Sequence, residues 1–170
     1  MFTPNKIKTF IESFENDCIK SLLPPEEGLI SNDQSIIPHA LIRGTRGYLE
    51  KIMHQANGCY ANGWYDACAV MIRRLIETLI IETFETYNLA HKIQGPSGDF
   101  LYLSDLINIT LSEQSWNLSR NAKQALPKLK DIGDKSAHSR RFNAVRHDID
   151  KIQADIRVVV QELTYLAQLK

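Results

Sequence analysis

A seven-residue repeat of apolar side chains near the C-terminal end constrains the fold more than any other feature of this chain. The repeat steps by alternating intervals of four and three residues through Val145, Ile149, Ile152, Ile156, Val159, Leu163 and Leu166. This spacing places all seven side chains on one face of a helix, which we predict over residues 143–168. That face could pair with a partner chain in a coiled coil, but packing inside the chain's own bundle explains the same pattern more simply.

Helical spacing also accounts for most of the remaining chain, so we predict an all-α bundle. No run alternates between apolar and polar residues for long enough to build a sheet. Helices are predicted over residues 38–57, 62–88 and 100–111, with Asn57-Gly58 ending the first of these. A weaker helix is predicted over residues 116–130, which Pro127 should end or kink. The 62–88 helix has the widest apolar stripe, as is typical of the central helix of a bundle.

Residues 1–37 are predicted to form a separate N-terminal part. Thr3-Pro4 is a typical start of a helix, and Pro24-Pro25 ends it. Its apolar face holds Ile7, Phe10, Ile11, Phe14, Cys18 and Leu22. An acidic, Pro-rich loop without periodicity follows. We expect this helix and loop to pack on a single domain formed by residues 38–170.

The charges are balanced over the whole chain but not along it. Twenty basic and twenty acidic residues give a formal net charge of zero, so no global field attracts nucleic acid or anionic lipid. Between residues 120 and 147, however, eight lysines and arginines face only two acids, Asp131 and Asp134, which leaves a net +6. If the chain binds an anionic ligand such as RNA or DNA, we expect it in the 120–147 region; the alternative is a basic face that is only solvated.

The cysteines and the apolar runs indicate where the protein works. Cys18, Cys59 and Cys68 are odd in number and lack CxxC spacing, which favours buried free thiols in a reducing compartment. Charges interrupt the apolar positions of the N-terminal segment, unlike a signal peptide, and no apolar run approaches the roughly 20 residues that span a bilayer. We expect a soluble cytoplasmic protein with no membrane contact, no metal and no cofactor.

Two polar motifs interrupt this apolar pattern. The first is Arg73-Arg74-Leu75-Ile76-Glu77 in the central helix, and the second is LKDIGDKSAH, residues 129–138. A partly buried Glu77 needs a charged partner, so we predict a structural clamp that joins Arg73 and Glu77 to Gly133 and Asp134. Residues 131–138 are predicted to be a turn, in which Gly133 has a positive φ at the end of the preceding helix.

These two motifs, about 55 residues apart and followed by an amphipathic helix, resemble an uncharacterised HEPN-like helical domain family. The resemblance covers about residues 45–168. Members of the family occur alone or attached to restriction and abortive-infection proteins. The resemblance implies a HEPN-like bundle of about five to six helices, with the N-terminal helix as an addition. It also implies a homodimer that acts in prokaryotic defence with a protein partner from such a system.

Domains of the wider superfamily are often metal-independent endoribonucleases, and the resemblance assigns roles to particular residues. In this chemistry an RNA 2′-OH attacks its own phosphodiester while a histidine moves the proton and an arginine stabilises the phosphoryl charge. His138 matches the histidine and Asp134 the polar residue, whereas the arginine position falls on Gly133. Lys130, Lys135 or Arg140 would have to replace that arginine. A lysine is a point charge and lacks the planar guanidinium that holds two phosphate oxygens.

The leading hypothesis is a catalytically degenerate HEPN-like module for protein association or nucleic-acid binding. The expected nucleic-acid-binding residues are Lys130, Lys135, Arg140, Arg141 and Arg146. One alternative is a metal-independent endoribonuclease that uses His138 and Lys130. Another is a purely regulatory dimerisation module without nucleic acid.

Overall fold

The computed structural model describes Lys8, residues 11–13 and residues 35–170. Every regular element within residues 35–170 is a helix, apart from an isolated β-bridge between Gln94 and Phe100, and this confirms the all-α prediction. The elements are α2 (His39–Ile42), α3 (Gly47–Ala61), α4 (Tyr65–Thr86), the 3-10 helix η2 (Ala90–Ile93), α5 (Leu103–Ser112), α6 (Arg120–His138), α7 (Arg146–Lys151) and α8 (Gln153–Leu166).

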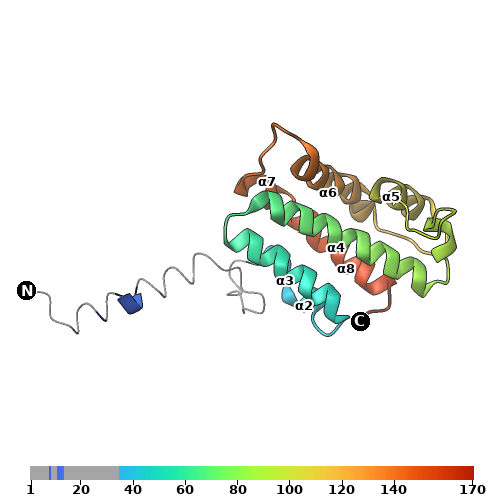
Figure 1. Ribbon diagram of the computed structural model, residues 1–170. Coiled ribbons are helices and arrows are strands. Elements are labelled where there is room, and N and C mark those ends of the chain that lie inside the picture. The colour runs from blue at the N-terminus through green and yellow to red at the C-terminus, as the bar shows by residue number, and fades with distance from the viewer. Residues whose placement is uncertain (1–7, 9–10, 14–34) are drawn as a thin grey trace, which may run out of the picture.

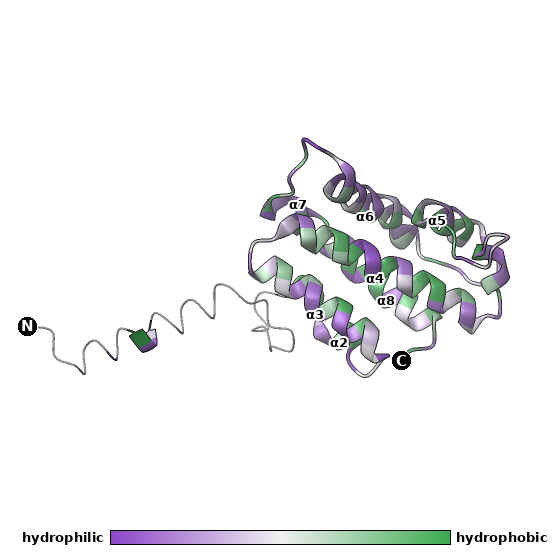
Figure 2. Cartoon of the chain, viewed as in Figure 1, coloured by the Kyte–Doolittle hydropathy of each residue, from purple (hydrophilic) through white to green (hydrophobic). Residues whose placement is uncertain are grey.

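Helix α4 is the centre of the bundle, as its wide apolar stripe predicts. It contacts α3, α5, α6, α7, α8 and η2, and Figure 1 shows α3 and α6 on opposite sides of it. Its fully buried side chains include Ile72, Leu75, Ile76, Leu79 and Phe84. In Figure 2 hydrophobic stretches recur along α4 between hydrophilic ones, because the helix buries more than one face.

The seven-residue repeat packs inside the chain's own bundle. Its five central members, from Ile149 to Leu163, are buried in the common core, whereas Val145 is 54% exposed. The predicted single helix over 143–168 is divided, because Ile152 leaves the helical conformation with φ −98° and ψ 2°. Helix α7 and helix α8 therefore share one apolar seam although Ile152 interrupts the helix between them.

The predicted helix over 38–57 is also divided and ends later than expected. Residues 43–46 separate α2 from α3, and Gly44 has a φ of +81°, which glycine adopts at little cost. Asn57 and Gly58 lie inside α3 and are buried, so the prediction that they end the helix is wrong. The Asn57 side chain instead holds the incoming chain: it accepts a hydrogen bond from the Ile37 N–H and donates one to the Ile37 carbonyl, both at 2.9 Å.

The prediction of a turn over residues 131–138 is wrong, because α6 continues to His138. The helix begins at Ser119, whose hydroxyl accepts a hydrogen bond from the Ala122 N–H, and it passes through Pro127 without ending. Its apolar face extends through Leu129 to Ile132, so burial continues past the proline. Two ion pairs, Lys130–Asp134 and Lys135–Asp131, each join residues that are one helical turn apart. They stabilise the last turns of α6.

Most of the predicted N-terminal helix and loop, with Cys18, lies outside the described residues. Among the described cysteines Cys68 is buried and Cys59 is half-buried, and both are free thiols. Burial raises the pKa of the Cys68 thiol to about 12, so it is inert at neutral pH. None of the helices within the described ranges has the length and apolar character needed to cross a membrane.

Candidate functional site

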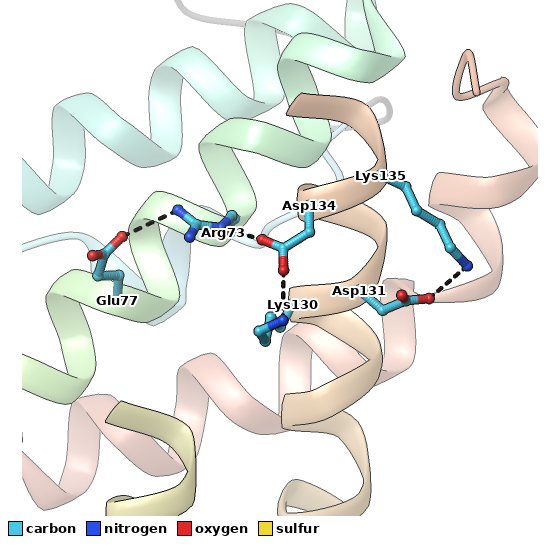
Figure 3. A network of polar contacts seen from close by, with 6 residues as sticks. All are labelled: Arg73, Glu77, Lys130, Asp131, Asp134 and Lys135. Atoms are coloured by element: carbon cyan, nitrogen blue, oxygen red, sulfur yellow. Dashed lines mark hydrogen bonds and ion pairs between the residues drawn. The ribbon is translucent and has the colours of Figure 1, made fainter. Parts of the chain in front are cut away.

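The two polar motifs of the sequence meet where α4 crosses α6. The Arg73 guanidinium of α4 donates from Nε to Asp134 Oδ1 of α6 at 2.8 Å, and its Nη1 lies 3.4 Å from Glu77 Oε2. The Lys130 ammonium donates to the other Asp134 oxygen at 2.5 Å. Figure 3 shows Arg73 and Lys130 reaching Asp134 from two helices. We call Arg73, Glu77, Lys130 and Asp134 the clamp. It differs from the predicted clamp in that Lys130 takes part and Gly133 does not.

The clamp is only partly accessible to water. Its four side chains are 25–30% exposed, so the charges are desolvated enough to need partners. Partial burial raises the pKa of Asp134, but the hydrogen bonds from Lys130 and Arg73 outweigh it and hold the pKa below its ordinary value. Asp134 is therefore a carboxylate at neutral pH, committed to two cations of its own chain.

Gly133 lies beside the clamp for a reason other than the predicted one. It is buried within α6 and does not have a positive φ, so that prediction is wrong. A Cβ at this position would lie 2.7 Å from Arg73 Cβ and 3.2 Å from the Ala69 carbonyl oxygen. Only a residue without a side chain lets α6 approach α4 this closely, and this approach brings Asp134 to Arg73.

The candidate catalytic residues His138 and Lys130 are not brought together. They are eight residues apart on α6, about 12 Å along its axis. Lys130 is turned toward α4 by Asp134, whereas His138 is exposed in the last turn. The structure therefore does not place Lys130 beside His138.

Three of the five predicted nucleic-acid-binding residues are paired with acids. Besides Lys130, Lys135 lies 2.7 Å from Asp131, and Arg146 lies 3.7 Å from Asp150. Arg146 also lies over the Tyr60 ring, 5.6 Å from its centre. These ion pairs neutralise part of the positive charge that the composition of residues 120–147 predicts.

The other two, Arg140 and Arg141, are exposed and have no acidic partner in the described part of the chain. They lie in the connector between α6 and α7, next to the exposed His138, and we call these three residues the basic tip. The connector is held at both ends: the Ser139 hydroxyl accepts a hydrogen bond from the Phe142 N–H at 3.2 Å, and Asp66 of α4 accepts one from the Ala144 N–H at 2.9 Å.

A second polar cluster was missed by sequence reasoning. Glu82 is buried in α4, where its carboxylate accepts a hydrogen bond from the Tyr48 hydroxyl and lies 2.8 Å from Arg46 Nε. Partial burial and the bond to Glu82 raise the pKa of Tyr48 to about 12. Tyr48 itself is 44% exposed. An acid within the apolar stripe of the central helix was the available signal for this cluster.

The arrangement offers no obvious place for a metal. Among residues 35–170 and the few described before them, no three His, Cys, Asp or Glu side chains gather as metal ligands would. Comparison of the chain with protein-family models, curated proteins and solved structures found no match. The function must therefore be argued from the clamp, the basic tip and the surfaces around them.

Proposed function

We propose that this chain is a catalytically degenerate HEPN-like helical module that binds nucleic acid through the basic tip without cleaving it. The observation that carries the proposal is the contrast between the two groups of cations on α6 and its connector. Lys130 is held by Asp134 inside the clamp, whereas Arg140 and Arg141 are exposed without an acidic partner in the described chain. Arginine binds two phosphate oxygens at once, so the tip suits a nucleic-acid backbone.

The positions that match the ribonuclease motif have structural contacts instead. Asp134 joins two helices, Gly133 permits their close approach, and Lys130 is paired. His138 is exposed in the last turn of α6, and the lysine of that turn, Lys135, is paired with Asp131 at 2.7 Å. Since these motif positions are engaged in contacts between helices, binding through the exposed arginines of the basic tip is favoured over cleavage.

The proposal includes a homodimer in a prokaryotic defence context, as the family resemblance implies. Two copies would present two basic tips, and each added phosphate contact strengthens binding and its dependence on salt. A two-tip surface would bind one nucleic-acid strand more tightly than a single tip.

Binding is tested with labelled single-stranded RNA and duplex DNA by fluorescence anisotropy across a series of salt concentrations. The variant Arg140→Gln/Arg141→Gln should weaken binding and lower the slope of log K against log salt by about 1–2. The matched control is Lys51→Gln/Arg74→Gln, two exposed cations on α3 and α4 with the same charge change. Equal losses in both variants would show that binding does not occur at the tip.

Cleavage is tested in the same samples with EDTA present. We expect intact RNA after long incubation for both the natural chain and His138→Ala. RNA cleavage that survives EDTA and disappears in His138→Ala would establish the endoribonuclease alternative. Absence of binding to any nucleic acid would leave the regulatory dimerisation module, which light scattering would detect as a dimer.

A further inference from the structure

Two neighbouring grooves lie where the chain enters the bundle. The first has a volume of about 550 Å³ and is lined by Leu41 of α2 and by Arg157, Tyr165 and Leu166 of α8. The second has a volume of about 600 Å³ and is lined by Ser35, His39 and Arg43. Ala40 and Lys170 line both grooves. We call the combined surface the entry groove.

The wall of the entry groove contains polar atoms that lack partners. Ser35 Oγ, His39 Nε2 and Thr164 Oγ1 are buried without a hydrogen-bond partner in the described part of the chain. The Thr164 residue is only 3% exposed. Three such atoms in the wall of one groove mark it as a place where the described chain leaves polar groups unsatisfied.

The groove also has apolar surface that is not covered. Tyr165 is 75% exposed, which is unusual for so large a side chain, and Leu41 and Leu166 are only half-buried. An apolar groove of this kind, with polar groups at its edges, accepts the apolar face of an amphipathic helix. The surface therefore favours a helical occupant over a small polar molecule.

We propose that the N-terminal segment of the same chain, residues 1–34, docks in the entry groove. The predicted helix from Thr3 to Leu22 would place its apolar face against Tyr165 and Leu166. Its face includes Ile11, which is 49% exposed in the structure and so has little cover. Docking would cover the apolar surface of the groove and the apolar face of the predicted helix together.

The length and attachment of this segment suit the groove. The segment joins the bundle at Ser35, which itself lines the groove. Residues 23–34 can extend to about 40 Å, and a helix of twenty residues is about 30 Å long. The segment therefore reaches α8 without disturbing the bundle.

The charges of the segment and the groove are complementary. Residues 1–34 hold six acids and three lysines, which gives a net −3. The groove is lined by Arg43, Arg157 and Lys170, while its acid, Glu162, is already bonded to the Ser119 N–H at 2.9 Å. Attraction between the two would favour this orientation of the segment over others.

Docking at the entry groove is independent of the proposed nucleic-acid binding. In Figure 1 the C-terminal end beside α2 and the connector between α6 and α7 lie at opposite ends of the bundle. A failure of one proposal therefore leaves the other unaffected.

Cross-linking from Cys18 tests the docking in the full-length chain. In a Cys59→Ser background, Gln161→Cys places a thiol on the groove wall, and a short bis-maleimide joins it to Cys18 when the segment is docked. The matched control is Gln124→Cys, an exposed position on α6 outside the groove. The buried Cys68 is common to both proteins.

We expect a cross-link within one chain that forms at least about tenfold faster at position 161 than at position 124, since docking raises the local concentration of Cys18. Adding Tyr165→Ser should reduce this preference. Equal rates at the two positions would overturn the proposal. A cross-link between two chains at position 161 would overturn docking within the chain and assign the groove to a second copy. If Tyr165→Ser leaves the preference for cross-linking at position 161 unchanged, the proposal that the segment docks in the entry groove is overturned.

Discussion

At the scale of single residues, Gly133 determines how closely α4 and α6 pack. Its missing side chain lets Arg73 and the Ala69 carbonyl lie against the α6 backbone. In an isolated helix alanine is more stable than glycine by about 1 kcal/mol, so local preference alone would favour alanine here. The sequence has glycine at this position, where the neighbouring helix occupies the space that a side chain would need.

We predict that Gly133→Ala destabilises the protein by about 1–3 kcal/mol, because the new Cβ must push the two helices apart. The measurement is urea unfolding followed by circular dichroism. Gly47→Ala is the control, since nothing lies within 4 Å of a Cβ at that position and its change should stay within about 0.5 kcal/mol. A Gly133→Ala protein as stable as the natural one would contradict the close approach of the helices.

Asp134 contributes to stability in a way that depends on pH. Its pKa is lower in the folded chain than its ordinary value, so the unfolded chain takes up a proton first as the pH falls. The stabilisation is complete above the ordinary carboxyl pKa of about 4, and it is lost as the pH falls through the folded value. Lowering the pH therefore weakens the clamp.

We predict that Asp134→Asn costs about 1–2 kcal/mol at pH 7, because Arg73 and Lys130 lose a shared charged partner. The difference from the natural chain should shrink when unfolding is measured at successive pH values from 5 down to about 3.5. Asp131→Asn is the control: its pair with Lys135 is exposed, and its loss should cost less than about 0.5 kcal/mol. A pH-independent difference would show that the charge of Asp134 does not stabilise the crossing.

At the scale of elements, α6 differs most from the sequence-based expectation. Pro127 and Gly133 both favour an early end to the helix, yet the apolar face and two ion pairs carry it on to His138. Burial of Leu129 and Ile132 against the bundle outweighs the unfavourable helix propensities of the two residues. The basic tip consequently lies at the end of a long helix instead of in the middle of a loop.

We predict that Ala137→Gly destabilises the protein by about 0.5–1 kcal/mol, because an exposed helical alanine is replaced by the residue that loses most backbone entropy. Asn143→Gly, in the exposed connector, should change stability by less than about 0.5 kcal/mol. Both are measured by urea unfolding. Equal effects would indicate that residues 131–138 do not form a stable helical turn.

At the scale of the whole molecule, α4 joins all layers of the bundle. Because it contacts the helices on both of its sides, loss of packing at its centre should weaken the domain as a unit. The clamp, the Tyr48–Glu82 cluster and the Asp66 bond to the connector all originate from this helix. Its position therefore determines where the polar contacts of the other helices can form.

We predict that Ile76→Ala, at a fully buried position of α4, lowers the free energy of unfolding by about 2–5 kcal/mol while the transition stays a single step. Ile81→Ala on the same helix is the control, since Ile81 is only partly buried and should cost clearly less. Thermal and urea unfolding would measure both. Separate transitions in the Ile76→Ala protein would contradict a single core.

The sequence by itself determined the all-α class, the central position of α4 and the inward face of α8. These follow from the period of the apolar residues, which is a local property of the chain. It also indicated that Glu77 needs a charged partner, and it predicted a clamp that includes Arg73 and Asp134. A charge beside apolar residues becomes partly buried and needs a partner in any fold, because its desolvation is costly.

Only the tertiary structure decided where the helices end, what Gly133 does and which cations stay exposed. Each of these depends on contacts between residues far apart in the chain: Asn57 with Ile37, Gly133 with Arg73, and Arg73 with Asp134, which also holds Lys130. Local propensities differ by about 1 kcal/mol or less for most residues, whereas burial against another helix contributes more, so packing overrides them. The separation of the clamp from the basic tip is a consequence of that packing.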